Sequence, residues 1–362
     1  MDFQLSDDQR ALRSGMRDLL GAVFDRDRMR AAVERGGALD RALWRELGAA
    51  GFFALRLPEE DGGVGLGLPE AVLLFEEAGR ALLPGPLVAT HLAAGRVKGA
   101  AEGAAVVTAA DGDRPVAHLA EADAVLSGSG PLDGEALRAF VAAARPVRSM
   151  DPLTPLHLPP PEPVAGRAAF APGRVAGPVV SGPERVTGPA ASAPGRAPAY
   201  AGRLRYEAAL LSAAEQLGSA ARTTEMAVQH ARERQQFGAP IGSFQAVKHL
   251  CADMLARTEP ARAAVYAAAV TGDPLEIAAA KLLADEAAVR NARDCLQIHG
   301  GMGFTWEADV HLHLKRAWLR GATGLTEAEA EEELAAGLGG APPRSGSSAA
   351  YGPGRSQAGG GA

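Results

Sequence analysis

The sequence predicts a mostly α-helical protein with a small β-rich middle domain. Two long stretches carry apolar residues at helical spacing, and the stretch between them is rich in proline and short β-like pieces. The chain has 362 residues, of which 47% are hydrophobic, so it can bury a large core in more than one domain. We expect an N-terminal helical domain over 1–103, a shortened β-rich domain over 104–198, a helical bundle over 199–335 and a disordered tail over 336–362.

The N-terminal region shows clear signals for where helices begin. Ser6 is a good N-cap, and Gln9 stands three residues later as its capping-box partner. A short helix is predicted over Leu39–Leu47. Pro69 suits the first turn of a further helix, which we expect over Glu70–Leu82.

The middle region alternates β-like pieces with turns. We predict short strands in AAVVTAA, DAVLSG and AFVAAARPV. The segments DPLTPLHLPPPEPV and GPERVTGPAASAPGRAP contain too many prolines for a regular helix. A small β domain with long loops follows from this pattern.

The C-terminal region returns to helical spacing. We expect one helix from Leu204 to Ala231, a second over Phe244–Arg257 and a third over Pro274–His299, packed as an antiparallel bundle. In the joint RERQQFGAPIGSFQ, Gly238 is expected to end the first helix and Ser243 to cap the second.

This joint also carries side chains that a plain turn does not need. Arg234 is expected in the last turn of one helix and Gln245 in the first turn of the next. A guanidinium and an amide at one end of a bundle can bind a diphosphate and an adenine-type edge. A cation near a helix C-terminus beside a core Phe237 would explain the same residues without a ligand. The joint alone leaves both interpretations open.

Composition and charge exclude several classes of function. The net charge is −6 and no basic stripe occurs, so nucleic acid is not an expected partner. The acidic, amphipathic start lacks the order of a signal peptide, and no run of about 18 apolar residues occurs. We therefore expect a soluble cytoplasmic protein without a membrane partner.

A metal site is not expected either. Cys251 and Cys295 fall in apolar helical patterns without metal-ligand spacing, which is typical of small core residues. His311 and His313 stand two residues apart, so they point to different sides of a helix. Trp306 is expected in the core or at an interface.

Three motifs together resemble the acyl-CoA dehydrogenase flavoprotein family. They are LPEEDGGVGLGLPEA, RERQQFGAPIGSFQ and QIHGGMGFTWEADVHLHLKRA, in this order. The resemblance covers roughly 1–100 and 199–318. It implies a helical domain, a β domain and a C-terminal four-helix bundle. It also implies FAD as cofactor, and removal of an α proton and a β hydride from an acyl-CoA thioester.

The resemblance also implies a set of cofactor-binding residues. In the family, the matching side chains and glycines reach across a subunit interface to the FAD of a neighbouring subunit. Here they are Arg234, Phe237, Gln245, Gln297, Gly300 and Gly301.

The general base is the first departure from the family. The usual glutamate position, 27 residues beyond Gln297, is occupied by Gly324. A minority of the family carries this glutamate 26 residues before the Arg234 position, which here is Ala208. Glu207 is one residue away, which rotates a side chain by about 100° on a helix. It is a candidate base, or it pairs with Arg203 or Arg205.

The middle domain is the second departure. The family's strand for the flavin ring contains a Trp, and 104–198 contains none. The chain therefore resembles the non-catalytic subunit of actinobacterial α₂β₂ acyl-CoA dehydrogenases, which act on bulky CoA thioesters such as those with steroid side chains. The resemblance implies a homologous catalytic partner that meets the acyl-CoA substrate. A self-sufficient homo-oligomeric enzyme using Glu207, and a flavin-free assembly subunit, stay open as alternatives.

Overall fold

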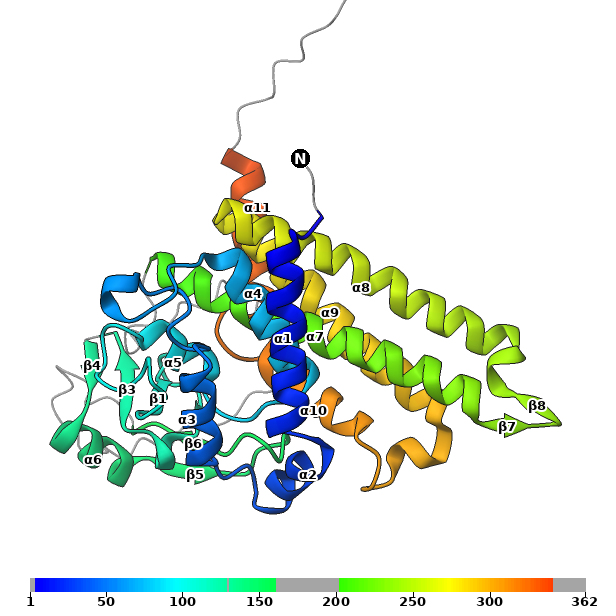
Figure 1. The fold of residues 1–362 in the computed structure, drawn as a ribbon, viewed down its shortest axis with the longest axis horizontal. Helices are drawn as coiled ribbons and strands as arrows, with labels where there is room; N and C mark the ends of the chain where they lie inside the picture. Colours follow the sequence, from blue (N-terminus) through cyan, green and yellow to red (C-terminus); the bar gives the residue numbers. More distant parts are fainter. Residues whose placement is uncertain (1–3, 129, 161–201, 341–362) are drawn as a thin grey trace, which may run out of the picture.

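The computed structural model describes residues 4–128, 130–160 and 202–340, and helices form the first and last parts of this described chain (Figure 1). The α-helices are α1 Asp7–Val23, α2 Arg26–Glu34, α3 Arg41–Ala49, α4 Leu68–Arg80, α5 Leu87–Ala93, α6 Gly134–Ala143, α7 Arg203–Glu233, α8 Gln245–Thr271, α9 Pro274–His299, α10 Val310–Gly321 and α11 Glu327–Gly340. The strands are β1 Val107–Ala109, β2 Val116–Ala117, β3 Ala124–Ser127, β4 Gly130–Leu132, β5 Arg145–Val147, β6 Leu156–Leu158, β7 Gln235–Gln236 and β8 Ala239–Pro240.

The predicted start signals of the N-terminal helices are confirmed. The Ser6 hydroxyl accepts from the Gln9 N–H at 3.1 Å, and the Gln9 amide oxygen accepts from the Ser6 N–H at 3.1 Å, which completes the capping box. Pro69 lies in the first turn of α4. The short helix α3 begins at Arg41, later than expected, because Asp40 caps it.

Two small three-stranded sheets form the middle region. One has the order β1-β3-β4, with β1 parallel to β3, and the other has the antiparallel order β2-β6-β5. The expectation of a strand throughout AFVAAARPV was wrong, because α6 covers its first half and only β5 is extended. Leu137 and Phe140, three residues apart, give α6 one buried face, which packs with Val125. The second proline-rich segment lies outside the described residues.

The three long helices α7, α8 and α9 build the bundle, and α4 crosses α7 at very close range. A Cβ at Gly79 would stand 2.0 Å from the Glu215 carbonyl oxygen, and one at Gly218 would stand 1.9 Å from that of Glu76. Only glycine allows this approach. Beyond the predicted end at Arg257, α8 continues through Pro260, because the residues after the proline bury their side chains in the core.

The end of the bundle is longer than predicted. Helix α11 continues to Gly340, past the expected start of the tail at 336, and residues 341–362 lie outside the described residues. Ala330 is fully buried, which fixes α11 on the core. Thr326 precedes the first residue of α11, and its hydroxyl accepts from the Glu329 N–H.

Figure 1 shows the hairpin β7–β8 at the far end of the bundle from β1, β3 and β4. Among the residues that the structure describes, no helix combines the length and the apolar character of a membrane span.

Candidate functional site

The joint between α7 and α8 is a short β-hairpin. Gln235 pairs with Pro240 and Gln236 with Ala239, and the turn residues Phe237 and Gly238 have φ of 53° and 78°. Gly238 therefore does not end α7 as predicted, since the helix stops before Arg234, whose N–H still bonds to the His230 carbonyl at 2.9 Å. Positive φ at two successive residues is the geometry of a type I′ hairpin turn.

The predicted cap of α8 was also wrong. Helix α8 does begin at Gln245, but its N-cap is Phe244, which has no side-chain cap. The Ser243 hydroxyl instead donates to the Pro240 carbonyl at 2.7 Å, inside the short 3₁₀ turn over Ile241–Ser243.

The second predicted cofactor segment follows α9. Gly300 ends this helix with φ 59° and ψ −140°, a backbone region that essentially only glycine adopts. No atom lies within 4 Å of a Cβ built on Gly300 or Gly301. A ligand can therefore approach the backbone closely here.

A pair of histidines brings the two segments together. The rings of His230 on α7 and His299 on α9 stack, with centroids 4.1 Å apart and planes 17° apart. The end of α7 and the glycine turn after α9 thus share one end of the bundle. Five of the six predicted cofactor residues are polar groups or glycines, and all six are exposed.

The polar side chains at this end have free donors and acceptors. Within the described part of the chain, Arg234, Gln245 and Gln297 make no side-chain hydrogen bond or ion pair. Large apolar side chains are exposed in the same two segments: Phe237 (94% exposed), Phe244, Met302, Phe304 and Trp306. Trp306, expected in the core or at an interface, is half exposed and lies beside Arg30 and Lys315. Exposed apolar groups beside unpaired polar groups are typical of an interaction surface.

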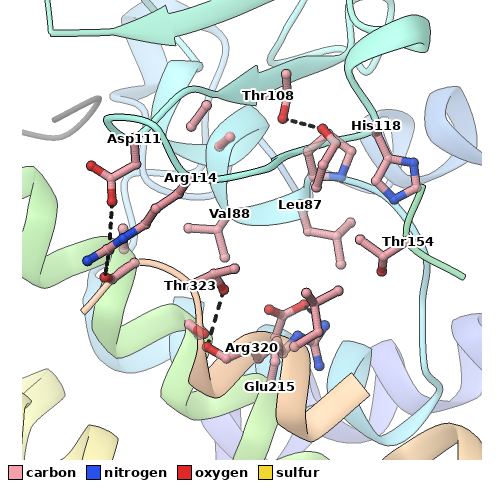
Figure 2. A pocket seen from close by; sticks show the side chains of 18 of the residues that line it. Leu87, Val88, Thr108, Asp111, Arg114, His118, Thr154, Glu215, Arg320 and Thr323 are labelled. Carbon is pink, nitrogen blue, oxygen red and sulfur yellow. Dashed lines mark hydrogen bonds and ion pairs between the residues drawn. The ribbon is translucent and has the colours of Figure 1, made fainter. Parts of the chain in front are cut away.

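A separate cavity of about 200 Å³ lies between the middle sheets, α5, α7 and α10 (Figure 2). Leu87, Val88 and Ala109 form apolar parts of its wall, and Thr108 and His118 lie at the side of the strands. The sheets and the bundle meet here, which is a common place for a ligand site.

Both positions at which the family carries its base line this cavity. Gly324 and Ala208 come from different elements, the loop after α10 and the first turns of α7, and neither has a carboxylate. The neighbouring Glu207 is not part of the lining. It accepts from Arg56 at 2.8 Å and from Arg203 at 2.7 Å.

The environment of Glu207 is that of a paired carboxylate. Burial raises the pKa of Glu207, but the hydrogen bonds and charges of Arg56 and Arg203 outweigh burial and hold that pKa below its ordinary value. A base for an α proton needs the opposite shift. The predicted pairing with Arg203 is confirmed, but Arg205 binds Glu333 at 2.7 Å and Arg56 takes its place at Glu207.

Two other lining residues do have carboxylates, Asp111 and Glu215. Asp111 accepts from Arg114 at 3.0 Å, and sequence reasoning missed Glu215. It is 5% exposed, and Arg320 Nη2 donates to its Oε1 at 2.5 Å (Figure 2). Burial raises the pKa of Glu215, while the charges of Arg320 and Arg316 act in the other direction. The only signal in the sequence is a lone acid within the apolar run AALLSAAEQLGSAA.

The histidines and cysteines form no metal site. Among the residues that the structure describes, no three His, Cys, Asp or Glu side chains are grouped so that they could hold a metal ion. The His313 ring Nδ1 lies 2.8 Å from the Ser219 hydroxyl in the core, whereas the His311 ring stacks on Trp306. Cys295 is buried as predicted, and Cys251 is half-buried.

Two family models match the chain. The acyl-CoA dehydrogenase C-terminal domain matches residues 200–327, and the acyl-CoA dehydrogenase N-terminal domain matches residues 6–99. The chain belongs to the acyl-CoA dehydrogenase family. Among curated relatives, acyl-CoA dehydrogenase IpdE2 of Mycobacterium tuberculosis is 35% identical over 318 residues, which is 84% of this chain and 88% of the relative. Both helical domains predicted from the sequence are therefore those of this oxidoreductase family.

Solved structures share the fold over most of their length. The ChsE4-ChsE5 complex from Mycobacterium tuberculosis gives a TM-score of 0.73 at 24% identity, over 94% of this chain and all of that chain. A variant of the steroid ACAD Tcur3481-Tcur3483 gives 0.70 at 22% identity, over 92% of this chain and 98% of that chain. This likeness confirms the predicted acyl-CoA dehydrogenase architecture with its small middle domain.

Proposed function

We propose that this chain is the cofactor-clamping subunit of a hetero-oligomeric acyl-CoA dehydrogenase. One observation carries the proposal: neither of the two base positions that line the cavity has a carboxylate, while the clamp segments at the other end of the bundle are free to bind. A homologous partner chain would supply the base and the contacts to the flavin ring. The assembly we infer is an α₂β₂ heterotetramer.

The exposed end of the bundle has the chemistry that the outer part of FAD needs. The guanidinium of Arg234 can bind a diphosphate, and the amides of Gln245 and Gln297 can bind polar edges. Gly300 and Gly301 leave the backbone open to an anion. Phe237 and Phe244 would pack against the partner. FAD bound there would accept the hydride from the substrate, and this chain's residues would hold and orient it.

The cavity, in contrast, does not fit a flavin ring together with an acyl thioester. Its volume of about 200 Å³ is below the roughly 300–1,000 Å³ of ordinary small-molecule sites. The middle sheets that form one wall have three short strands each. This size supports cofactor chemistry on a partner chain rather than inside this one.

The substrate we infer is a bulky CoA thioester with a steroid-type acyl group. The support is the sequence resemblance to the actinobacterial branch and the fold shared with a steroid ACAD and with a two-component complex. A role in steroid side-chain degradation follows from this substrate.

The decisive experiment is purification of the full chain alone and co-expressed with its neighbouring homologue. We expect a colourless protein alone, and a complex with the visible absorbance of FAD. Arg234→Ala should lower the FAD count per tetramer, and Arg232→Ala, on the same exposed joint, is the matched control. A yellow protein from this chain alone would contradict the proposal, and a colourless complex would favour the assembly-subunit alternative.

The homo-oligomeric alternative has its own test. Glu207→Gln removes the carboxylate but keeps a similar shape and one acceptor for Arg56. If Glu207 is the base, this variant loses dehydrogenation of the acyl thioester. We expect the co-expressed complex to keep its full rate, because Glu207 points to arginines and not into the cavity.

A further inference from the structure

The cavity in Figure 2 is lined by the buried Arg316 and the half-buried Arg320, and each has one buried nitrogen without an acceptor among the described residues. Arg316 is 3% exposed, and its Nη2 has no acceptor among the described residues. Arg320 lies one helical turn further along α10, and its Nη1 likewise has no acceptor among the described residues. A buried charged N–H group without a partner is costly, so such a group calls for an acceptor.

The rest of the network is already satisfied. The other nitrogens of Arg316 donate to Asp151 and to the Leu83 carbonyl, the latter at 3.1 Å. Arg320 Nη2 is held by Glu215, and Lys281 is held by Asp285. Each buried cation thus has its own carboxylate, and the two free guanidinium nitrogens remain as donors toward the cavity.

The protonation of this wall favours an anion. Burial raises the pKa of Glu215, toward the uncharged acid. Burial lowers the pKa of Arg320 to about 10, so the guanidinium still carries its charge at neutral pH. The cavity wall therefore carries the positive charge of Arg320.

The remainder of the wall is apolar and the space is small. Leu87, Val88, Ala109, Leu319 and Leu325 contribute to it. The volume of about 200 Å³ is somewhat larger than a cavity of about 150 Å³ that holds benzene. One ring or a short chain fits beside the two arginines.

We propose that this cavity binds a carboxylate on a small apolar body, with Arg316 Nη2 and Arg320 Nη1 as its donors. The proposal goes beyond the clamp function, because the cavity lies away from the clamp segments and binding there needs neither FAD nor a partner. The anion completes the hydrogen bonds that the fold leaves open.

The test compares two probes of nearly the same shape on the full chain. Cyclohexanecarboxylate carries the anion, and cyclohexanecarboxamide is its neutral counterpart. Titration calorimetry should give the carboxylate at least about tenfold tighter binding, since hydrogen bonds to charged groups are the stronger ones. Equal affinity of the two probes, or no binding of either, overturns the proposal.

Variants then locate the site. The double variant Glu215→Gln/Arg320→Met removes both partners of one ion pair, so neither partner is left with an unpaired charge. This double variant leaves Arg316 Nη2 as a single donor, so it should lose most of the preference for the carboxylate and keep carboxamide binding. Val88→Phe, which fills the apolar part, should weaken both probes even if the double variant fails to fold. Arg290→Gln, a surface arginine paired with Glu286, is the control and should change neither affinity. A preference that survives both cavity changes overturns the proposal.

The carboxylate can belong to a free acid or to the far end of a dicarboxylyl thioester. Tight binding of cyclohexanecarboxylate assigns the free acid. Binding of adipoyl-CoA but not hexanoyl-CoA, abolished by the double variant, assigns the acid end of a thioester. If hexanoyl-CoA binds as tightly as adipoyl-CoA, and cyclohexanecarboxylate binds no tighter than cyclohexanecarboxamide, then the arginines do not recognise a carboxylate.

Discussion

Phe237 stands edge-on against Phe244, with ring centroids 6.1 Å apart and planes 87° apart. The first ring is 94% exposed and stands on a backbone with φ 53°, which is unfavourable for a residue with a side chain. The hairpin thus holds an aromatic ring in water on a strained turn. Strain of this kind is typical of a functional position.

Phe237→Asn is predicted to separate stability from assembly. Asn-Gly suits the turn better than Phe-Gly, so the thermal midpoint of the chain alone should stay level or rise. FAD occupancy or partner affinity in the co-expressed complex should fall roughly tenfold, because a large apolar contact is lost. Val270→Asn, at an exposed position near the other end of α8, is the control. A complex with unchanged affinity and FAD content would show that Phe237 has no interface role.

Gly218→Ala is predicted to be severely destabilising. The new Cβ would stand 1.9 Å from the Glu76 carbonyl oxygen, so α4 and α7 must move apart. The loss should be on the order of 3 kcal/mol or more in chemical unfolding. Gly15→Ala in α1, where nothing lies within 4 Å, is the matched change and should stabilise by up to about 1 kcal/mol. Equal effects of the two changes would mean that the helices are not in close contact.

Much of this fold was predictable, since α7 and α9 follow from apolar spacing and the Ser6 cap from local hydrogen bonding. Short windows were ambiguous: AFVAAARPV has an apolar run that suits a strand or a helix, and packing of Phe140 decided for the helix. The hairpin was missed because Phe237-Gly238 is not a usual turn pair. Counting from the family motifs located the two base positions at Gly324 and Ala208, and in the structure both line one cavity. The pairing of Glu215 with Arg320 depends on tertiary contacts that no local pattern reveals.

Acid should destabilise the protein through its buried histidines. Burial lowers the pKa of His91 to about 4, with its ring Nδ1 3.2 Å from the Phe52 carbonyl. The unfolded chain, with a pKa near 6.5, then binds more protons between about pH 4 and 6.5, so the free energy of unfolding falls as pH falls through this window. The loss from His91 is on the order of 3 kcal/mol by pH 4. Chemical unfolding across pH 4–7 measures it.

The variant His91→Asn keeps a donor for the Phe52 carbonyl but cannot titrate. It should flatten the pH dependence of the free energy of unfolding, while His313, whose pKa burial lowers to about 3, keeps part of the slope. The same slope in both proteins would show that His91 is not buried as a neutral ring.

Placing a carboxylate at a family base position tests whether flavin chemistry can take place beside this chain's own cavity. In Ala208→Glu, a glutamate stands at a family base position, but the cavity of about 200 Å³ has no room for flavin and thioester together. We therefore expect the variant complex to keep the dehydrogenation rate and FAD count per tetramer of the unchanged complex. Ala208→Gln has nearly the same shape without a base, so the two variants should agree. A rate gained with Glu but not with Gln, measured with an artificial electron acceptor, would place working flavin chemistry beside this chain's own cavity.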